Sequence, residues 1–150
     1  MNISLNGVNL IKGFEGYSGT PYQDVVGVWT WGYGHARKHG EDLPESITRE
    51  GAEELLLKDL EPACKCVNTC VSVPINQNQF DALASFVYNI GCSSFTASTL
   101  LKKINASEMD GAENEFLRWN KAGGKVIDGL TRRRQAEAKL FSTPINTEAT

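Results

Sequence analysis

Residues 22–35 read YQDVVGVWTWGYGH, and this stretch decides the fold of the first third of the chain. Most of its side chains are β-branched or aromatic, and three glycines interrupt them. Side chains of these two kinds favour strands, and glycine gives the backbone the freedom that tight turns need. The pattern predicts two or three short antiparallel strands between Tyr22 and Tyr33, with Asp24 and Thr30 on the small sheet.

Helical patterns flank this stretch on both sides. Before it, Asn6 is expected to cap a helix that Gly16 ends. After it, residues 37–47 are expected to form a loop with room for one more short strand, and Thr48 is expected to cap a long helix. Pro62 lies inside that long helix, so either the helix kinks or a new one begins near residue 62.

The second half of the chain is predicted to be helical. Asn76 and Gln79 form an approximate capping box, and the apolar repeat after them runs to Gly91. Further helical patterns cover residues 98–104, 107–119 and 130–141, and the chain is expected to fray from Pro144. The whole pattern predicts a mostly helical α+β fold.

Composition and charge exclude several classes of protein. A chain of 150 residues that is 41% hydrophobic and 22% charged is a single globular domain, neither disordered nor fibrous. The pattern of the first residues does not predict a signal peptide, and the sequence has no apolar run of about 18 residues, so stable membrane insertion is not expected. Arg132, Arg133 and Arg134 are interpreted as a solvated helix face with one or two ion pairs, in preference to a site for an anionic polymer. No basic stripe with interleaved aromatic residues is present, which argues against nucleic acid as a partner.

The cysteines give no metal-site pattern. Their spacing is not a known zinc spacing, and both histidines are distant in sequence, so no metal and no cofactor are expected. In a reducing cytoplasm the cysteines are expected to be small buried hydrophobic residues or free thiols. The alternative is that a disulfide forms after export to an oxidising compartment. The four cysteines are Cys64, Cys66, Cys70 and Cys92.

Glu15 and Asp24 are the candidate catalytic residues. Hydrolysis of a glycosidic bond needs one carboxyl group to protonate the leaving oxygen and another to activate water. Glu15 is flanked by Phe14 and Tyr17, whose rings suit a proton donor, while Asp24 near the Thr30 hydroxyl suits a group that stays ionised. The alternative is ordinary: a surface glutamate at a helix end and an aspartate in a turn.

The motifs together resemble the phage-type lysozymes, glycoside hydrolase family 24, of the T-even and lambdoid kind. The resemblance covers about residues 6–142 and is carried by Glu15-Gly16, Tyr22 with Asp24, Gly27, Thr30, Gly32-x-Gly34-His35, VPINQNQFDAL at 73–83, YNIG at 88–91, STLL at 98–101, and GLTRRR at 129–134 with Glu137. It implies a lysozyme-like fold of two lobes joined by a long helix. The small N-terminal sheet lobe would cover about residues 16–60, and the helical lobe about 61–143 plus the helix 6–15.

The resemblance also implies an inverting muramidase, which cuts the β-1,4 bond between N-acetylmuramic acid and N-acetylglucosamine in peptidoglycan. Glu15 would be the general acid, and Asp24 with Thr30 would hold and activate the attacking water. Other positions match the family as well: Arg134 (or Arg133) as the partner of Glu15, His35 with Asp59 as a structural salt bridge, and Asn89 and Thr131 as contacts to sugar or peptide.

The implied biology is that of an endolysin. The enzyme would act as a monomer, stay in the host cytoplasm until a holin releases it, and then attack the wall in the periplasm to lyse the cell.

Two rival functions share the expected fold. A lytic transglycosylase cleaves the same bond without water, which leaves Asp24 and Thr30 unexplained, and a wall-binding module would need no catalytic residues at all.

Overall fold

The computed structural model describes residues 1–145 and contains two compact units. One unit consists of residues 8–61, and the other of residues 1–7 together with the chain from Pro62 onward. The division places residues 8–15 with the sheet, whereas the sequence interpretation grouped the first helix with the helical lobe. Among the described residues, no helix is both long and apolar enough to cross a membrane.

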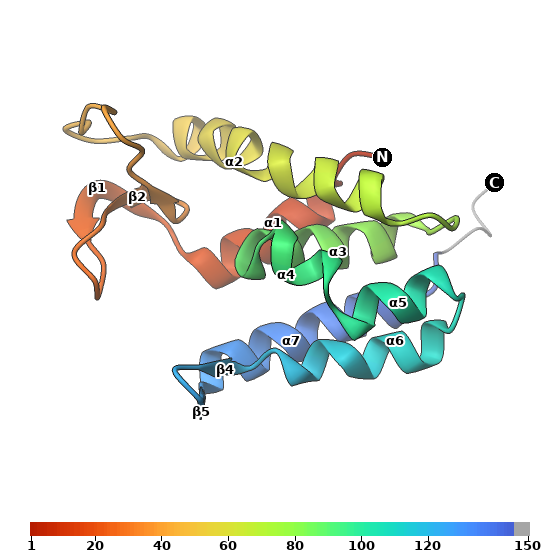
Figure 1. The fold of residues 1–150 in the computed structure, drawn as a ribbon. Coiled ribbons are helices and arrows are strands. Elements are labelled where there is room, and N and C mark those ends of the chain that lie inside the picture. Colours follow the sequence, from red (N-terminus) through yellow and green to blue (C-terminus); the bar gives the residue numbers. More distant parts are fainter. Residues whose placement is uncertain (146–150) are drawn as a thin grey trace. The chain divides into compact units, whose positions relative to one another are not determined.

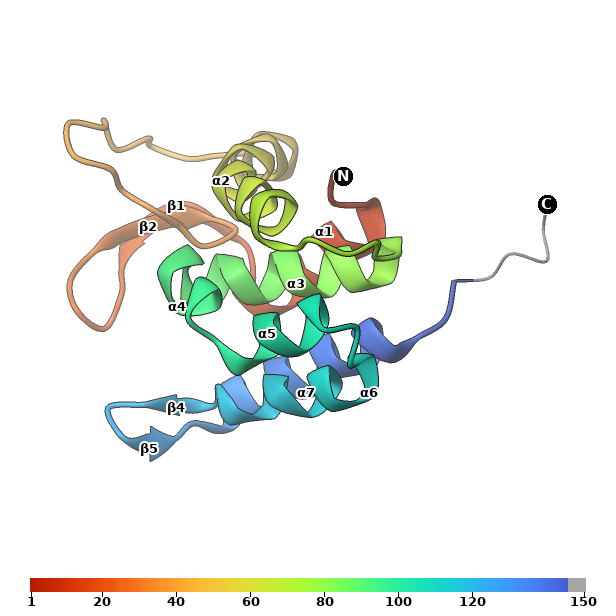
Figure 2. The same cartoon turned by 45° about the vertical axis from the view of Figure 1, so that its right-hand side comes forward.

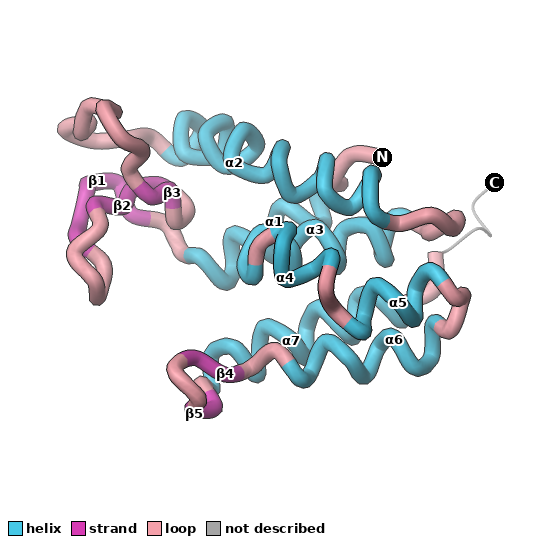
Figure 3. Tube along the Cα trace, viewed as in Figure 1, coloured by secondary structure: helices cyan, strands magenta, loops and turns pink. Residues whose placement is uncertain are grey.

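The unit of residues 8–61 contains a three-stranded antiparallel sheet (Figure 3). Its strands β1 (Ser18–Gln23), β2 (Trp29–Gly32) and β3 (His35–Ala36) follow the chain order, so two tight turns connect them. The antiparallel strands are therefore confirmed, but their bounds differ from the prediction: β1 begins at Ser18, β3 follows Tyr33, and Asp24 lies in the turn after β1, outside any strand. The stretch 37–48 contains no strand, so the one extra strand that the sequence allowed there does not form.

Helix α1 (Leu5–Glu15) begins earlier than expected. The Ser4 hydroxyl accepts a hydrogen bond from the Gly7 amide at 3.3 Å, so Ser4 holds the capping position and Asn6 lies inside the first turn. The prediction that Asn6 is the cap was wrong, because Ser4 is fixed by the buried Asp81, whose carboxylate accepts from the Ser4 amide at 2.9 Å. Gly16 ends the helix as predicted, with a φ of 70°.

Helix α2 (Arg49–Cys70) continues through Pro62 as one helix. Its start is as predicted, since the Thr48 hydroxyl accepts from the Gly51 amide at 3.0 Å. The alternative of a new helix at residue 62 is wrong. Proline removes one backbone hydrogen bond, but Leu60 and Ala63 on either side of it are buried, and this packing keeps the helix intact.

The unit that contains residues 62–145 is helical, and its helices lie against one another in Figures 1 and 2. Its elements are α3 (Gln77–Ile90), α4 (Cys92–Thr96), α5 (Thr99–Asn105), α6 (Met109–Glu115), the 3-10 helix η1 (Phe116–Arg118), β4 (Lys121–Ala122), β5 (Lys125–Val126) and α7 (Asp128–Ser142). The core contains the fully buried side chains of Phe80, Leu83, Phe86, Phe95, Leu100, Ile104 and Phe116. Phe86 contacts Phe95 and Phe116 edge to face, which is the favoured geometry for aromatic pairs.

The capping box at the start of α3 is confirmed. The Asn76 side chain accepts from the Gln79 amide at 2.8 Å, and the Gln79 side chain accepts from the Asn76 amide at 2.8 Å. Residues 80–87 of α3 are all buried, so the middle of this helix has no face open to solvent, while both of its ends are partly exposed.

Three features of this unit were missed or misplaced by the sequence patterns. Helix α4 was not expected, and the predicted helix 107–119 is shorter because Ser107 has a φ of 60° and the last turn is a 3-10 helix. The strands β4 and β5 form a hairpin where only a loop was expected. Its turn residues Gly123 and Gly124 have φ values of 58° and 79°, which suits the tight hairpin turn that needs positive φ at both positions.

The fold also decides the state of two cysteines. Cys66 and Cys92 form a disulfide with a Cα to Cα distance of 5.9 Å, which is the second of the two states that the sequence left open and gives a pairing that the sequence did not predict. The bond forms because packing brings the second half of α2 to the start of α4, a proximity that residues 26 positions apart do not reveal in sequence. Of the frayed end predicted from Pro144, Pro144 and Ile145 follow α7 outside any helix, and residues 146–150 lie outside the described residues.

Candidate active site

Glu15 stands at the C-terminal end of α1 in the unit of residues 8–61. The helix ends directly after it, since the Gly16 amide donates to the Lys12 carbonyl at 2.9 Å and the chain then turns toward β1. One turn earlier, the Lys12 ammonium pairs with Glu53 of α2 at 2.8 Å. This ion pair ties the end of α1 to α2 and so helps to fix the backbone that carries Glu15.

Gly34 packs directly against the Glu15 carboxyl group. A Cβ atom at residue 34 would lie 3.0 Å from Glu15 Oε1 and 3.2 Å from Cδ, closer than ordinary contact. The backbone there also has a φ of 75°, which disfavours other residues. The turn after β2 therefore needs glycine at this position both for its shape and to leave room for the carboxyl group.

Asp24 organises the turn between β1 and β2. Its Oδ1 accepts hydrogen bonds from the amides of Val26 at 3.0 Å and Val28 at 2.8 Å, and its own amide donates to the Val28 carbonyl at 2.9 Å. In residues 1–145, no hydrogen bond engages the second carboxylate oxygen, Oδ2. One oxygen thus holds the side chain in place while the other remains available.

Thr30 lies on β2 with its side chain on the same face of the sheet as Asp24. The strand register pairs Tyr22 with Thr30, and continuing it by two residues sets Asp24 opposite Val28. Asp24 and Thr30 are therefore diagonal neighbours across two strands, a relation in which side chains still reach one another. Thr30 is buried, and its hydroxyl donates a hydrogen bond to the Val28 carbonyl at 3.1 Å. Because its one hydrogen is used there, the hydroxyl oxygen can only accept a hydrogen bond from a further partner.

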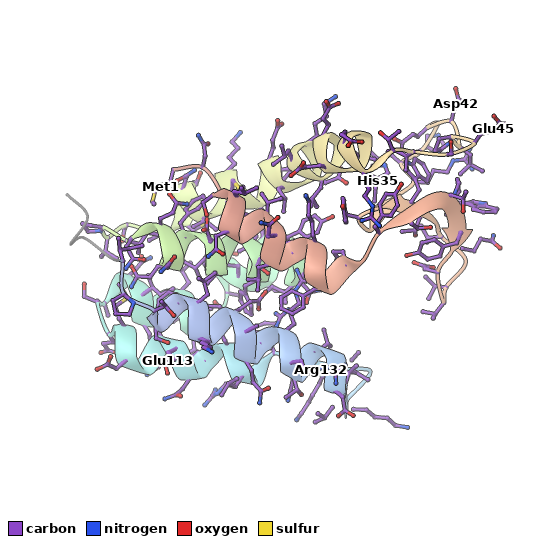
Figure 4. All side chains as sticks on the ribbon, turned by 180° about the vertical axis from the view of Figure 1, so that it is seen from behind. Met1, His35, Asp42, Glu45, Glu113 and Arg132 are labelled. Carbon is purple, nitrogen blue, oxygen red and sulfur yellow. A yellow bond between two sulfur atoms is a disulfide. The ribbon has the colours of Figure 1, made fainter. Side chains whose placement is uncertain are left out.

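His35, the first residue of β3, bridges two carboxylates. Its Nδ1 lies 2.7 Å from Asp59 Oδ2 on α2, and its Nε2 lies 2.9 Å from Glu41 Oε1. The side chain is only 2% exposed. Figure 4 shows His35 next to α2, with Asp42 and Glu45 farther out on the loop that joins sheet and helix.

Glu41 was not singled out from the sequence, and nothing local marks it. Desolvation alone would raise the pKa of Glu41, but hydrogen bonds from the Lys38 amide and from His35, together with nearby positive charge, lower it below its ordinary value. The loop is thereby fastened to the sheet through His35.

Arg134 is fully buried on α7, in the unit that contains residues 62–145. Its Nη2 donates to Asn89 Oδ1 at the end of α3, its Nε lies 3.1 Å from Glu137 Oε1, and its guanidinium lies over the Phe86 ring. Burial lowers the pKa of Arg134, an effect that the charge of Glu137 opposes. The structure thus joins two of the predicted residues, Asn89 and Arg134, because the arginine orients the exposed amide.

Arg133 and Glu137 belong to the same buried network. Glu137 Oε2 accepts from the Ser85 hydroxyl at 2.5 Å and lies 3.3 Å from Arg133 Nε. Burial raises the pKa of Glu137, and the two arginines and the serine hydroxyl oppose that shift. The solvated face predicted for the three arginines holds for the exposed Arg132, whereas Arg133 and Arg134 are buried.

Thr131 connects α7 to the small hairpin. Its hydroxyl accepts from the Asn120 side chain at 3.1 Å and donates to the Ile127 carbonyl at 3.4 Å. Asn120 precedes β4, and its carbonyl accepts from the Ile127 amide at 2.9 Å. The Thr131 hydroxyl therefore joins the two ends of the β4–β5 hairpin, Asn120 and Ile127, to the first turn of α7.

Comparison with known proteins decides the family. The family model described as phage lysozyme matches residues 12–137. The chain belongs to the phage lysozyme family. Phage lysozymes are glycoside hydrolases, so this chain is an enzyme, and the lysozyme-like α+β fold predicted for it is confirmed.

Relatives of this phage lysozyme match over most of its length. It is 46% identical to the endolysin of Acyrthosiphon pisum secondary endosymbiont phage 1, over 95% of this chain and 99% of the relative. It is also 46% identical to the endolysin of Bacillus phage B103. That match covers 95% of this chain and 55% of the relative, so the chain spans about half the length of that longer protein. The solved endolysin from Escherichia coli O157:H7 phage FAHEc1 superimposes with a TM-score of 0.88 at 38% identity, covering 95% and 94% of the two chains.

Proposed function

We propose that this phage lysozyme is an endolysin that hydrolyses the β-1,4 bond between N-acetylmuramic acid and N-acetylglucosamine with inversion, and so lyses the host cell. Peptidoglycan is the substrate of lysozymes, and the endolysin relatives support the lytic role. The observation that carries the mechanism is the arrangement of Asp24 and Thr30 on one sheet face, in the same unit as the Glu15 carboxyl that Gly34 accommodates.

Glu15 is the general acid in this proposal. Its proton passes to the glycosidic oxygen as the bond from that oxygen to the anomeric carbon breaks. The Gly34 backbone against the carboxyl limits the positions that Oε1 can take, which is the kind of positioning that proton transfer needs.

Asp24 and Thr30 position the attacking water. The water donates one hydrogen to the lone pair of the Thr30 hydroxyl and the other to Asp24 Oδ2, so its own lone pair is free to attack the anomeric carbon from the opposite face. Asp24 takes up the proton that the water loses. For an inverting site of this kind the two carboxyl groups stand about 6.5–9.5 Å apart.

Substitution of the two carboxyl groups tests these roles. We expect Glu15→Gln and Asp24→Asn each to lower the rate of lysis of purified sacculi at least a hundredfold, while binding to sacculi in a sedimentation assay persists. Glu45→Gln and Asp42→Asn are matched controls, since both side chains are exposed on the loop of the same unit (Figure 4). Lysis that survives Glu15→Gln at more than a tenth of the original rate would show that the site is misassigned.

The hydroxyl of Thr30 is tested separately. Thr30→Val keeps the shape but removes the lone pair offered to water, and we expect kcat to fall about tenfold or more. Thr30→Ser restores the hydroxyl and should recover most of that loss. Equal activity of the two variants would mean that the hydroxyl has no part in holding water.

Product analysis distinguishes hydrolysis from transglycosylation. Hydrolysis with inversion gives a reducing muramic acid end whose first-formed anomer is α, which NMR detects before mutarotation. A lytic transglycosylase would instead give an anhydro product lighter by one water molecule in mass spectrometry. An anhydro product would refute the role given to Asp24 and Thr30.

The residues of the other unit have supporting roles in the proposal. Asn89 and Thr131 contact sugar or peptide, so their alanine variants should raise KM more than they lower kcat.

Access to the wall completes the proposal. Peptidoglycan lies outside the cytoplasmic membrane, and we propose that a holin releases the enzyme, which then acts in the periplasm as a monomer. Expression with and without a co-expressed holin tests the first point, since lysis should follow only when the holin is present. Light scattering during size exclusion tests the second.

A further inference from the structure

Three sulfur atoms gather in the unit that contains residues 62–145. The Sγ atoms of Cys66, Cys70 and Cys92 all lie within 4.8 Å of one another. Cys66 and Cys70 are one helical turn apart on α2, and Cys92 is the first residue of α4. Cys64, only two positions before Cys66, is not part of this cluster.

We propose that the reduced protein binds one thiophilic divalent cation of the zinc class through the thiolates of Cys66, Cys70 and Cys92. In the structure, Cys66 and Cys92 are joined as a disulfide, so the site becomes available on reduction. A dithiol reductant supplies the two electrons, the S–S bond breaks, each sulfur takes up a proton, and the reductant becomes a disulfide. Binding of the cation then forms three metal to sulfur bonds and releases three protons.

The geometry of the cluster suits such an ion. Zinc to sulfur bonds of about 2.3 Å in a tetrahedron set the sulfur atoms about 3.8 Å apart. After reduction, the Cys66 and Cys92 sulfur atoms are free to separate, and contacts to Cys70 that are now as long as 4.8 Å need to shorten by about 1 Å. Rotation of the cysteine side chains covers that range, because α2 already holds two of them on one face at the i, i+4 spacing.

Burial gives the site an inner and an outer side. Cys66 is 5% exposed, Cys70 is partly buried, and Cys92 is exposed. The ion therefore has an entry path beside Cys92 and a shielded ligand in Cys66. Three protein ligands leave the fourth position of a tetrahedral ion to water.

The ion and the disulfide exclude one another, since oxidation removes two of the three ligands. Both nevertheless join the same elements, α2 and α4. In a reducing compartment, where disulfides do not persist, the ion would supply the cross-link, and in an oxidising compartment the disulfide would replace it. The site is independent of the catalytic proposal, as none of its residues belongs to that mechanism.

Titration of the reduced protein with Cd²⁺ tests the proposal. We expect one ion per chain and a thiolate to cadmium charge-transfer absorbance that corresponds to three thiolates, and Cd²⁺ should displace Zn²⁺ that is already bound, because the softer ion binds thiolates more tightly. Cys70→Ser should weaken binding at least tenfold. Cys64→Ser is the matched control and should leave affinity and absorbance unchanged, because Cys64 lies outside the cluster.

Thermal melting gives a second readout. Zn²⁺ at a hundredfold above its Kd should raise the Tm of the reduced protein by roughly 5–10 °C, and a chelator should reverse the rise. Three results would overturn the proposal: no saturable binding, equal weakening by Cys64→Ser and Cys70→Ser, or undiminished binding by oxidised protein with the Cys66–Cys92 bond intact. Because Cys70→Ser retains that disulfide, a failure to fold would be recognised by melting the oxidised variant.

Discussion

Replacement of His35 by asparagine should lower stability without abolishing lysis. The imidazole is 2% exposed and contacts Asp59 at 2.7 Å and Glu41 at 2.9 Å. A hydrogen bond to a charged group contributes about 1.5–3 kcal/mol when the group is buried, and an exposed ion pair contributes about 0.5 kcal/mol. The Asp59 side chain is 10% exposed and the Glu41 side chain 30% exposed, so the Asp59 contact dominates.

The sum for His35→Asn is a loss of about 2–4 kcal/mol in the free energy of unfolding. In a domain of this length each kcal/mol corresponds to roughly 2–4 °C, so Tm should fall by about 5–15 °C. His39→Asn is the matched control, since His39 is the other histidine of the chain and its side chain is exposed. Thermal denaturation followed by circular dichroism measures both variants, and lysis of sacculi well below the Tm measures activity.

The pH dependence of the protein's stability follows in part from Glu41. Its pKa is lowered in the folded state, so its contribution to stability is present above the ordinary pKa and is lost as the pH falls through the lowered value. The Tm of the unsubstituted protein should therefore fall more steeply between pH 6 and about pH 3 than that of Glu41→Gln.

Two results would refute the structural role given to His35: a Tm of His35→Asn equal to that of His39→Asn, or a loss of lysis by His35→Asn at an unchanged Tm.

Three further substitutions follow from the structure. Gly34→Ala should cost about 1–2 kcal/mol for its positive φ and lower kcat about tenfold or more by displacing the Glu15 carboxyl; an unchanged kcat in steady-state kinetics would contradict this. Glu137→Ala leaves two buried guanidinium groups without their carboxylate and should cost about 3–5 kcal/mol in urea denaturation, a cost that an exposed site would not show. Asn76→Ala removes the α3 cap and should cost about 1 kcal/mol with unchanged lysis, and a loss below a few tenths would argue against the cap.

Features that depend on residues close together in sequence were predictable. The Asn76 capping box, the Thr48 cap and the strands around Gly27 all formed as expected, because short-range hydrogen bonds and backbone preferences decide them. The β4–β5 hairpin carries a local signal too, since Gly123-Gly124 suits a tight hairpin turn.

The residues of the candidate site also fall into two groups, those that the local sequence singles out and those that only the fold brings together. Glu15, Asp24 and Thr30 stood out by residue type and spacing, and their roles remain a proposal. Glu41 carried no local signal as a partner of His35, because only the fold brings the loop back against the sheet. The orientation of Asn89 by Arg134 likewise needs two helices to pack.

The sequence by itself determined the family, the class of chemistry and most of the helix and strand positions, since these depend on local patterns and on motifs at set spacings. Only the tertiary structure decided which cysteines pair, that α2 passes unbroken through Pro62, and that Arg133 and Arg134 are buried around Glu137. The reason is physical. Each of these outcomes depends on side chains far apart in sequence, whose meeting is a result of packing the whole core.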